Sequence, residues 1–200
     1  MTIRKIKPKE KKLIDRVVTI HLLAFSGFFL SSLNRGFLRC LYKSICEYEN
    51  SDLLVAFEDE KPVGFLAYGK NIGGLYSYMI KTHVIEFAWF SFLAFLKRPS
   101  ILPKMLRALT MPSKNKRHTH TVKVSSIGVD PEYRNRGIGT LLLDEMKRDI
   151  NFEDIDYVTL ETDAIDNDNT IEFYVRNGFR FSYQFVTPEN RKMNVYHFRQ

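Results

Sequence analysis

The sequence predicts an α/β (α+β) fold in which a mixed central sheet is flanked by helices. Short runs rich in β-branched and aromatic residues alternate along the chain with segments whose apolar residues recur every three or four positions. With 44% hydrophobic and 26% charged residues in a chain of 200, the composition is that of a globular protein. We therefore expect one domain that spans residues 1–200.

The first part of the chain predicts three strands and two helices. A short strand is expected at residues 2–7 and an amphipathic helix at 13–24. A second helix is expected at 28–48, where apolar residues form a stripe at helical spacing. Two β-rich runs at 53–57 and 63–68 flank an acidic turn that ends in proline, and this pattern predicts a hairpin.

Residues 72–111 form an aromatic, helix-period segment that is interrupted by prolines. This segment predicts a helical insertion between the third and fourth strands. Residues 84–96 are almost all apolar, but they contain Glu86 and fall well short of the roughly 20 residues that a membrane-spanning helix needs. We therefore expect that this segment does not span a membrane.

The rest of the chain predicts four strands and two helices. Asn177 and Gly178 together are typical of a left-handed helix end, and a Pro-Glu-Asn turn separates the last two strands. The expected strands are 119–129, 157–161, 179–186 and 192–198, and the expected helices are 137–150 and 169–176.

The net charge of +7 is unevenly distributed. Residues 97–117 carry seven Lys and Arg and no acid, whereas residues 144–172 carry eleven acids. A basic surface suits the phosphates of a cofactor, a nucleotide-linked substrate, an anionic membrane or nucleic acid, and an acidic run suits a cationic amine. The alternative for each run is a solvated face that only keeps the protein in solution.

The two cysteines indicate a reducing compartment. Cys40 and Cys46 are six positions apart on an expected helix, where they point to different faces and cannot easily bridge. Residues 1–12 are too highly charged to contain the apolar region of a signal peptide. We therefore expect a cytoplasmic protein whose thiols are packing residues.

A glycine-punctuated turn between a strand and a helix predicts a phosphate-binding loop. Gly137 and Gly139 let the backbone approach a bulky anion without an intervening Cβ. The helix that follows offers unpaired N–H groups and the positive end of its dipole. Arg134 and Arg136 add positive charge at the same place.

Two motifs resemble the GCN5-related N-acetyltransferase (GNAT) superfamily. The spacing Arg134-x-x-Gly137-x-Gly139 is similar to the pyrophosphate loop of that superfamily, and about 30 residues later Asn167-x-x-Thr170-x-x-Phe173-Tyr174-x-x-Asn177-Gly178-Phe179 is similar to its second signature. The resemblance implies a mixed sheet of about six to seven strands. It also implies that the fourth and fifth strands splay apart to admit the pantetheine arm of acetyl-CoA. The insertion at 72–111 departs from the common plan.

The resemblance implies a set of residues that bind acetyl-CoA, the acyl donor. Backbone groups of the fourth strand would pair with pantetheine, and backbone N–H groups of the loop would bind the pyrophosphate. Asn167 would bind CoA or the loop backbone. The implied residues are Ile127, Gly128, Val129, Arg134, Asn135, Arg136, Gly137, Ile138, Gly139, Thr140, Asn167 and Tyr174.

The small residues of the fourth strand fit this interpretation. Ser125, Ser126 and Gly128 are compatible with a β-bulge or with close approach of a ligand. The alternative is a plain strand whose serines face solvent.

For catalysis, the resemblance places Tyr174 as the general acid that protonates the departing thiolate. The alternative is that Tyr174 only packs its ring. The N–H of Ile127 or Val129 is the expected oxyanion partner. The candidate bases are His118 and His120 before the fourth strand, Glu161 and Asp163 at the end of the fifth, or a water chain to any of these. We expect no metal, because two histidines are not a site.

We expect the acceptor to be a primary amine on a small molecule, such as an amino sugar or a sugar nucleotide, and direct transfer in a ternary complex. The first helices and the insertion would line the pocket that binds the acceptor. Aromatic residues could stack on the acceptor, and the alternatives for them are the core or the face of a homodimer. These aromatics are Phe28, Phe29, Tyr76, Tyr78, Phe87, Trp89 and Phe90.

Two other functions remain open. One is a peripheral membrane or assembly module that docks through the insertion and the basic run at 97–117. The other is a protein N-acetyltransferase. Nucleic acid is not an expected partner, because the basic run lacks a recognition helix or a stacking platform.

Overall fold

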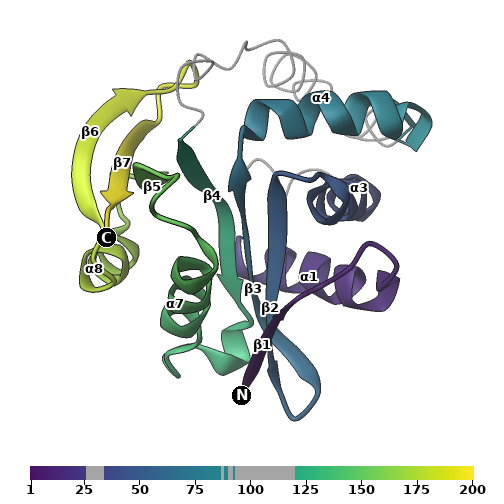
Figure 1. The fold of residues 1–200 in the computed structure, drawn as a ribbon, viewed down its shortest axis with the longest axis horizontal. Coiled ribbons are helices and arrows are strands. Elements are labelled where there is room, and N and C mark those ends of the chain that lie inside the picture. Colours follow the sequence, from purple (N-terminus) through teal and green to yellow (C-terminus); the bar gives the residue numbers. More distant parts are fainter. Residues whose placement is uncertain (26–33, 87, 90–91, 93–119) are drawn as a thin grey trace.

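The computed structural model describes residues 1–25, 34–86, 88–89, 92 and 120–200 (Figure 1). Its strands form a seven-stranded sheet in the order β1-β2-β3-β4-β5-β7-β6. Only β4 and β5 pair in parallel, so the sheet is mixed, as predicted. The strands are β1 (Thr2–Lys5), β2 (Ser51–Glu58), β3 (Lys61–Lys70), β4 (Thr121–Val129), β5 (Tyr157–Asp163), β6 (Arg180–Val186) and β7 (Lys192–Phe198).

Helices pack on both faces of this sheet and create two separate cores. One core lies between α1, α3 and α4 and one face of β2 and β3. The other lies between the opposite face and α7 and α8, and it extends across β4 and β5 (Figure 1). The helices are α1 (Lys11–Ala24), α3 (Arg35–Glu47), α4 (Ile72–Thr82), α7 (Ile138–Asp149) and α8 (Asp168–Arg176), with a short 3-10 turn, η2 (Pro131–Tyr133).

Each helix follows from a local sequence signal. Asn34 caps α3 by accepting a hydrogen bond from the N–H of Phe37 (2.9 Å), which satisfies an otherwise unpaired donor. In α7 the buried residues Ile138, Leu142 and Met146 recur every four positions and face the sheet. Gly178, which follows the C-cap Asn177 of α8, has a φ of +84°, and this confirms the predicted left-handed helix end.

Most of the predicted elements agree with the structure to within a few residues. The second expected helix, 28–48, is an exception, because α3 covers Arg35–Glu47 and the backbone of Asn34 before it is extended. The insertion after β3 begins with α4, as its helical period indicates. Residues 28–33 of the second expected helix and residues 87, 90–91 and 93–111 of the insertion lie outside the described part of the chain. Within the described part, no helix is both long and apolar enough to cross a bilayer.

Candidate active site

The parallel strands β4 and β5 separate soon after they begin. The two strands pair only where residues Thr121–Lys123 of β4 lie beside residues Tyr157–Thr159 of β5. Beyond these residues β4 continues along β3 to Val129, and β5 continues along β7 to Asp163. The two edges that face each other therefore diverge and leave backbone N–H and C=O groups available to a ligand that carries amides. We call this opening the β4–β5 fork.

A β-bulge lies on the β4 side of the fork. Ala67 of β3 is opposite Ser126, whereas Tyr68 is opposite Val124, so Ser125 is an extra residue. The bulge agrees with one interpretation of the small residues in this strand. At Gly128 we expected close approach of a ligand, but the groups that approach it are aromatic rings of the protein. A Cβ there would lie 2.7 Å from the ring of Phe65 and 3.3 Å from that of Phe25. Gly128 therefore accommodates core aromatic rings on this side.

The loop after β4 presents a helix N-terminus at the open end of the fork. Gly137 adopts a left-handed φ of +75°, and a Cβ at this position would have no atom within 4 Å. The first bond that continues α7 runs from Leu141 N to Gly137 O (3.0 Å). The N–H groups of Ile138, Gly139 and Thr140 precede this bond and have no carbonyl of their own helix to pair with. This arrangement fits an anion cradle.

The space beside Gly139 is occupied by another helix. A Cβ at Gly139 would lie 2.9 Å from Cζ of Phe173 on α8. We expected the missing side chain of Gly139 to admit a ligand, and the structure shows that it admits the Phe173 ring. Its backbone N–H still lies in the first turn of α7, so Gly139 remains a candidate for binding through its main chain.

The two arginines of the loop have different surroundings. Arg136 donates to Glu58 (3.3 Å), and its guanidinium lies 4.9 Å from the centre of the Tyr133 ring. Arg134 is exposed and has no ion-pair partner among the described residues. Asn135, between them, has a φ of +60°, which turns the chain into the cradle. Arg134 is therefore the loop cation that is free to bind a phosphate.

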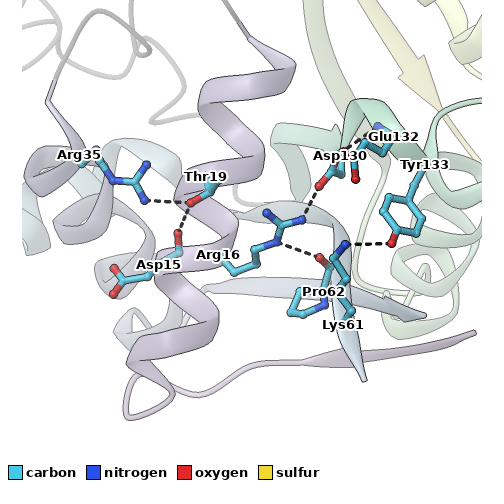
Figure 2. A network of polar contacts seen from close by, with 9 residues as sticks. All are labelled: Asp15, Arg16, Thr19, Arg35, Lys61, Pro62, Asp130, Glu132 and Tyr133. Carbon is cyan, nitrogen blue, oxygen red and sulfur yellow. Dashed lines mark hydrogen bonds and ion pairs between the residues drawn. The ribbon is translucent and has the colours of Figure 1, made fainter. Parts of the chain in front are cut away.

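A buried carboxylate anchors the start of this loop (Figure 2). Asp130 accepts a hydrogen bond from Glu132 N (3.1 Å) and forms an ion pair with Arg16 of α1. Arg16 also donates to the carbonyl of Pro62 (3.2 Å), so one guanidinium joins α1, β3 and the loop. Sequence reasoning did not identify this pair. The available signal was an aspartate followed by proline at the start of a helical turn, which is typical of an N-cap.

A second contact holds the loop against the hairpin of β2 and β3. Lys61 donates to the hydroxyl of Tyr133 (3.0 Å), and its ammonium lies 5.0 Å from the centre of the same ring (Figure 2). The loop is therefore fixed from two sides before any ligand binds, which lowers the entropic cost of binding.

Tyr174 projects into the core beneath α8. Its ring is 7% exposed and packs against Phe173 and Phe179. Burial raises the pKa of Tyr174 to about 12, so the hydroxyl stays protonated at neutral pH and is able to donate a proton. Among the described residues the hydroxyl has no hydrogen-bond partner.

Asn167 connects the end of β5 to the start of α8. Its amide donates to Thr162 Oγ1 (2.6 Å) and to the carbonyl of Asp163 (2.9 Å). Both partners belong to β5 and not to the loop of residues 134–140, so these contacts are neither of the two that the resemblance implies.

The candidate bases lie in different places. Glu161 accepts a hydrogen bond from Lys123 Nζ (2.5 Å) at the fork. Asp163 accepts two bonds from Arg191 Nη2 (2.7 and 2.8 Å). His120 precedes the first paired residues of β4, at the closed end of the fork, and its Nδ1 contacts the carbonyl of Asp154 (3.0 Å). The structure therefore brings Glu161, and not His120, to the fork, and His118 lies outside the described residues.

Comparison with known proteins agrees with this geometry. The model of the acetyltransferase (GNAT) family matches residues 17–179. The chain belongs to the GNAT acetyltransferase family. A search of curated protein sequences finds no match.

Solved structures of GNAT proteins share the fold. A ribosomal-protein-alanine N-acetyltransferase from Brucella melitensis is 13% identical and covers 100% of both chains, with a TM-score of 0.64. An N-acetyltransferase from Staphylococcus aureus is 15% identical, covers 98% of this chain and 100% of its own, and has a TM-score of 0.62. A structure from Bacillus anthracis in complex with acetyl coenzyme A is 15% identical, covers 80% of this chain and 68% of its own, and has a TM-score of 0.52.

The GNAT site described here fits an acyl-CoA in three respects. The fork offers unpaired backbone groups to an extended chain of amides, the first turn of α7 offers N–H groups to a diphosphate, and the space outside Gly137 is open. Residues of this GNAT chain that would hold acetyl-CoA are the backbones of Ile127 and Val129 and of the loop from Arg134 to Thr140. In the part of the chain that the structure describes, no group of three or more His, Cys, Asp and Glu forms a metal site.

Proposed function

We propose that this GNAT protein transfers an acetyl group from acetyl-CoA to a primary amine of a small-molecule acceptor, by direct transfer in a ternary complex. The observation that carries this proposal is the β4–β5 fork, which opens toward the N-terminus of α7. Acetyl-CoA supplies an activated thioester to this site. The other requirements of the reaction fall to side chains and backbone groups of the protein itself.

Three parts of the protein perform the reaction in this proposal. Backbone N–H groups of β4 at Ile127 or Val129 stabilise the negative charge that develops on the carbonyl oxygen. Tyr174 donates the proton that the departing sulfur takes up, because a tyrosine hydroxyl is protonated at neutral pH. Glu161 at the fork receives the proton that the acceptor amine loses, directly or through water.

The charge of the site supports an amine as the acceptor. Glu161 and Asp163 lie two positions apart on β5, and each already binds a cationic side chain of this chain. Carboxylates at this spacing lie on one face of a strand. An amino sugar or a sugar nucleotide fits this chemistry. The printed names of two structural neighbours refer to different acceptors, streptothricin for the Bacillus anthracis protein and ribosomal-protein alanine for the Brucella protein.

A second candidate is a peripheral membrane or assembly module on the same fold. The observation that favours it is the apolar surface that follows α4, where Ile85 is 82% exposed and Val84, Trp89 and Phe92 are each more than half exposed. The basic run at 97–117 and the aromatic residues Phe28, Phe29, Phe87 and Phe90 lie outside the described residues.

A thiol-release screen tests the proposal. Purified protein is incubated with acetyl-CoA and a panel of amino sugars, sugar nucleotides, polyamines, amino acids and peptide N-termini, and free CoA thiol is measured. Thiol release that depends on one acceptor class supports the enzyme and names the class. Release with peptides alone would make it a protein N-acetyltransferase. Co-sedimentation with anionic vesicles that is lost at high salt, without thiol release, would favour the docking module.

A further inference from the structure

A lysine of the protein itself occupies the β4–β5 fork. Lys123 is the last residue of β4 that is in register with β5. Its neighbours Val122 and Val124 belong to the core under α7, so Lys123 points to the opposite face, because successive strand residues alternate. On β5, Leu160 belongs to the same core, which places Glu161 on the same face as Lys123.

An ion pair joins these two side chains across the fork. Lys123 Nζ donates to Glu161 Oε1 (2.5 Å), although their strands are no longer paired at Glu161. The side chains remain 32% and 36% exposed, so solvent and a small ligand reach them. The pair therefore holds a primary amine against a carboxylate at the point where the strands begin to separate.

In this arrangement the amine of Lys123 corresponds to the acceptor of the reaction and the carboxylate of Glu161 corresponds to its base. A nucleophile within hydrogen-bond reach of a proton acceptor is the general sign of an activated group. Lys123 carries the same functional group that the proposed reaction acetylates, and an acceptor amine that binds Glu161 must displace it. The Lys123 ammonium therefore occupies the place that the proposed function assigns to the acceptor.

We propose that Lys123 is acetylated by the active site of its own chain. The inference rests on the proposed function, because it takes acetyl-CoA as the acyl donor. Lys123 first loses a proton to Glu161. Its nitrogen lone pair then forms a bond to the thioester carbonyl carbon, and the carbon–sulfur bond breaks, with its electron pair remaining on sulfur. Tyr174 protonates the sulfur, the second proton passes from nitrogen to solvent and back to Tyr174, and the products are acetyl-lysine, CoA thiol and one released proton.

Acetylation changes the charge balance at the fork. An acetylated Lys123 is neutral and no longer pairs with Glu161, so this carboxylate loses its cation. Glu161 then becomes available to the ammonium group of an external acceptor. The modification and the acceptor reaction therefore use the same carboxylate.

Isotope-labelled acetyl-CoA provides the test, without knowledge of the acceptor. The full-length protein is incubated with acetyl-CoA that carries a heavy-isotope acetyl group, and the label is located by peptide mass spectrometry. We expect Lys123 to be labelled faster than Lys192, an exposed lysine at the start of β7 that reports ordinary chemical acetylation. Because the reaction is intramolecular, its first-order rate should not change with protein concentration. Excess CoA and the variant Tyr174→Phe should each slow it.

One variant and the measurement of acetyl-CoA binding separate the possible outcomes. Lys123→Arg retains a cation for Glu161 but removes the acceptor, so this variant should keep its binding of acetyl-CoA by calorimetry and lose the fast label. Labelling of Lys123 no faster than that of Lys192, in a protein that binds acetyl-CoA and acetylates an external amine, would overturn the inference and leave the proposed function intact. Absence of acetyl-CoA binding would overturn both.

Discussion

The ring of Phe173 lies where a side chain of Gly139 would begin, with Cζ 2.9 Å from the position of a Cβ. Gly139 is in the first turn of α7, and Phe173 is next to Tyr174 on α8. The contact therefore joins the helix that is proposed to bind the pyrophosphate to the helix that carries the proposed acid. The two halves of the site are packed against each other through a glycine.

We predict that Gly139→Ala destabilises the protein, by about 1–3 kcal/mol, because the new methyl group overpacks this contact. It should also lower turnover by displacing Tyr174. Urea unfolding and steady-state kinetics measure both effects. The double variant Gly139→Ala/Phe173→Leu should recover stability. Gly137→Ala serves as the comparison. Its new methyl group contacts no atom, so the expected loss of stability, about 1–2 kcal/mol, comes from the left-handed φ alone. An unchanged urea midpoint for Gly139→Ala would show that the space between Gly139 and Phe173 accommodates a methyl group without loss of stability.

The two loop arginines should contribute unequally to binding. Arg134→Ala should weaken acetyl-CoA binding about tenfold, because a hydrogen bond between charged groups contributes about 1.5 kcal/mol or more. Arg136→Ala should have a smaller effect, because Arg136 is already paired with Glu58. Calorimetry at low and high salt measures the difference, and the effect of Arg134 should shrink as salt screens it. Equal losses for the two variants would argue against Arg134 as the free phosphate ligand.

Replacing Tyr174 by phenylalanine should lower kcat about a hundredfold and leave the affinity for acetyl-CoA unchanged, since general acids contribute on this order. With its pKa raised to about 12, the Tyr174 hydroxyl is protonated across neutral and moderately alkaline pH. The pH profile of the wild type should therefore show no alkaline fall from this group below about pH 11. The measurement is kcat against pH for both proteins, and turnover that survives the substitution would assign the proton to another donor.

Stability should depend on pH through His21. This residue is 2% exposed, its Nδ1 lies 2.7 Å from the Tyr42 hydroxyl, and burial lowers its pKa from 6.5 to about 4. The unfolded chain binds more protons between these values, so stability is full above pH 6.5 and falls as pH decreases toward 4. The loss amounts to at most about 3 kcal/mol.

Urea unfolding of the wild type and of His21→Phe at pH 7 and pH 5 measures this loss. The variant should lack the part of the pH dependence that comes from His21. Tyr42→Phe is the matched control: it removes the hydrogen bond but leaves the ring buried, so the pH dependence should persist. Parallel pH curves for the wild type and His21→Phe would exclude His21 as the cause.

Sequence alone was sufficient to predict the seven strands, the presence of a helix at each of α1, α3, α4, α7 and α8, and the loop that precedes α7, although the start of α3 differs. These features depend on local rules: apolar periodicity selects strand or helix, Gly137 supplies a left-handed φ, and Gly178 ends α8. The order of the two GNAT motifs could also be recognised from the sequence, because each motif is a short contiguous segment. The sequence therefore determined the class of fold and the place of the proposed phosphate site.

Only the tertiary structure decided what each site residue touches. The anchoring of Asp130 by Arg16, the filling of the space at Gly139 by Phe173 and the pairing of Lys123 with Glu161 all join residues from different elements. His120 and Glu161 were equivalent candidates in the sequence, and the divergence of β4 from β5 separated them. Such contacts form when elements that are distant in the sequence pack together. A local sequence pattern does not indicate which distant side chain a residue will contact.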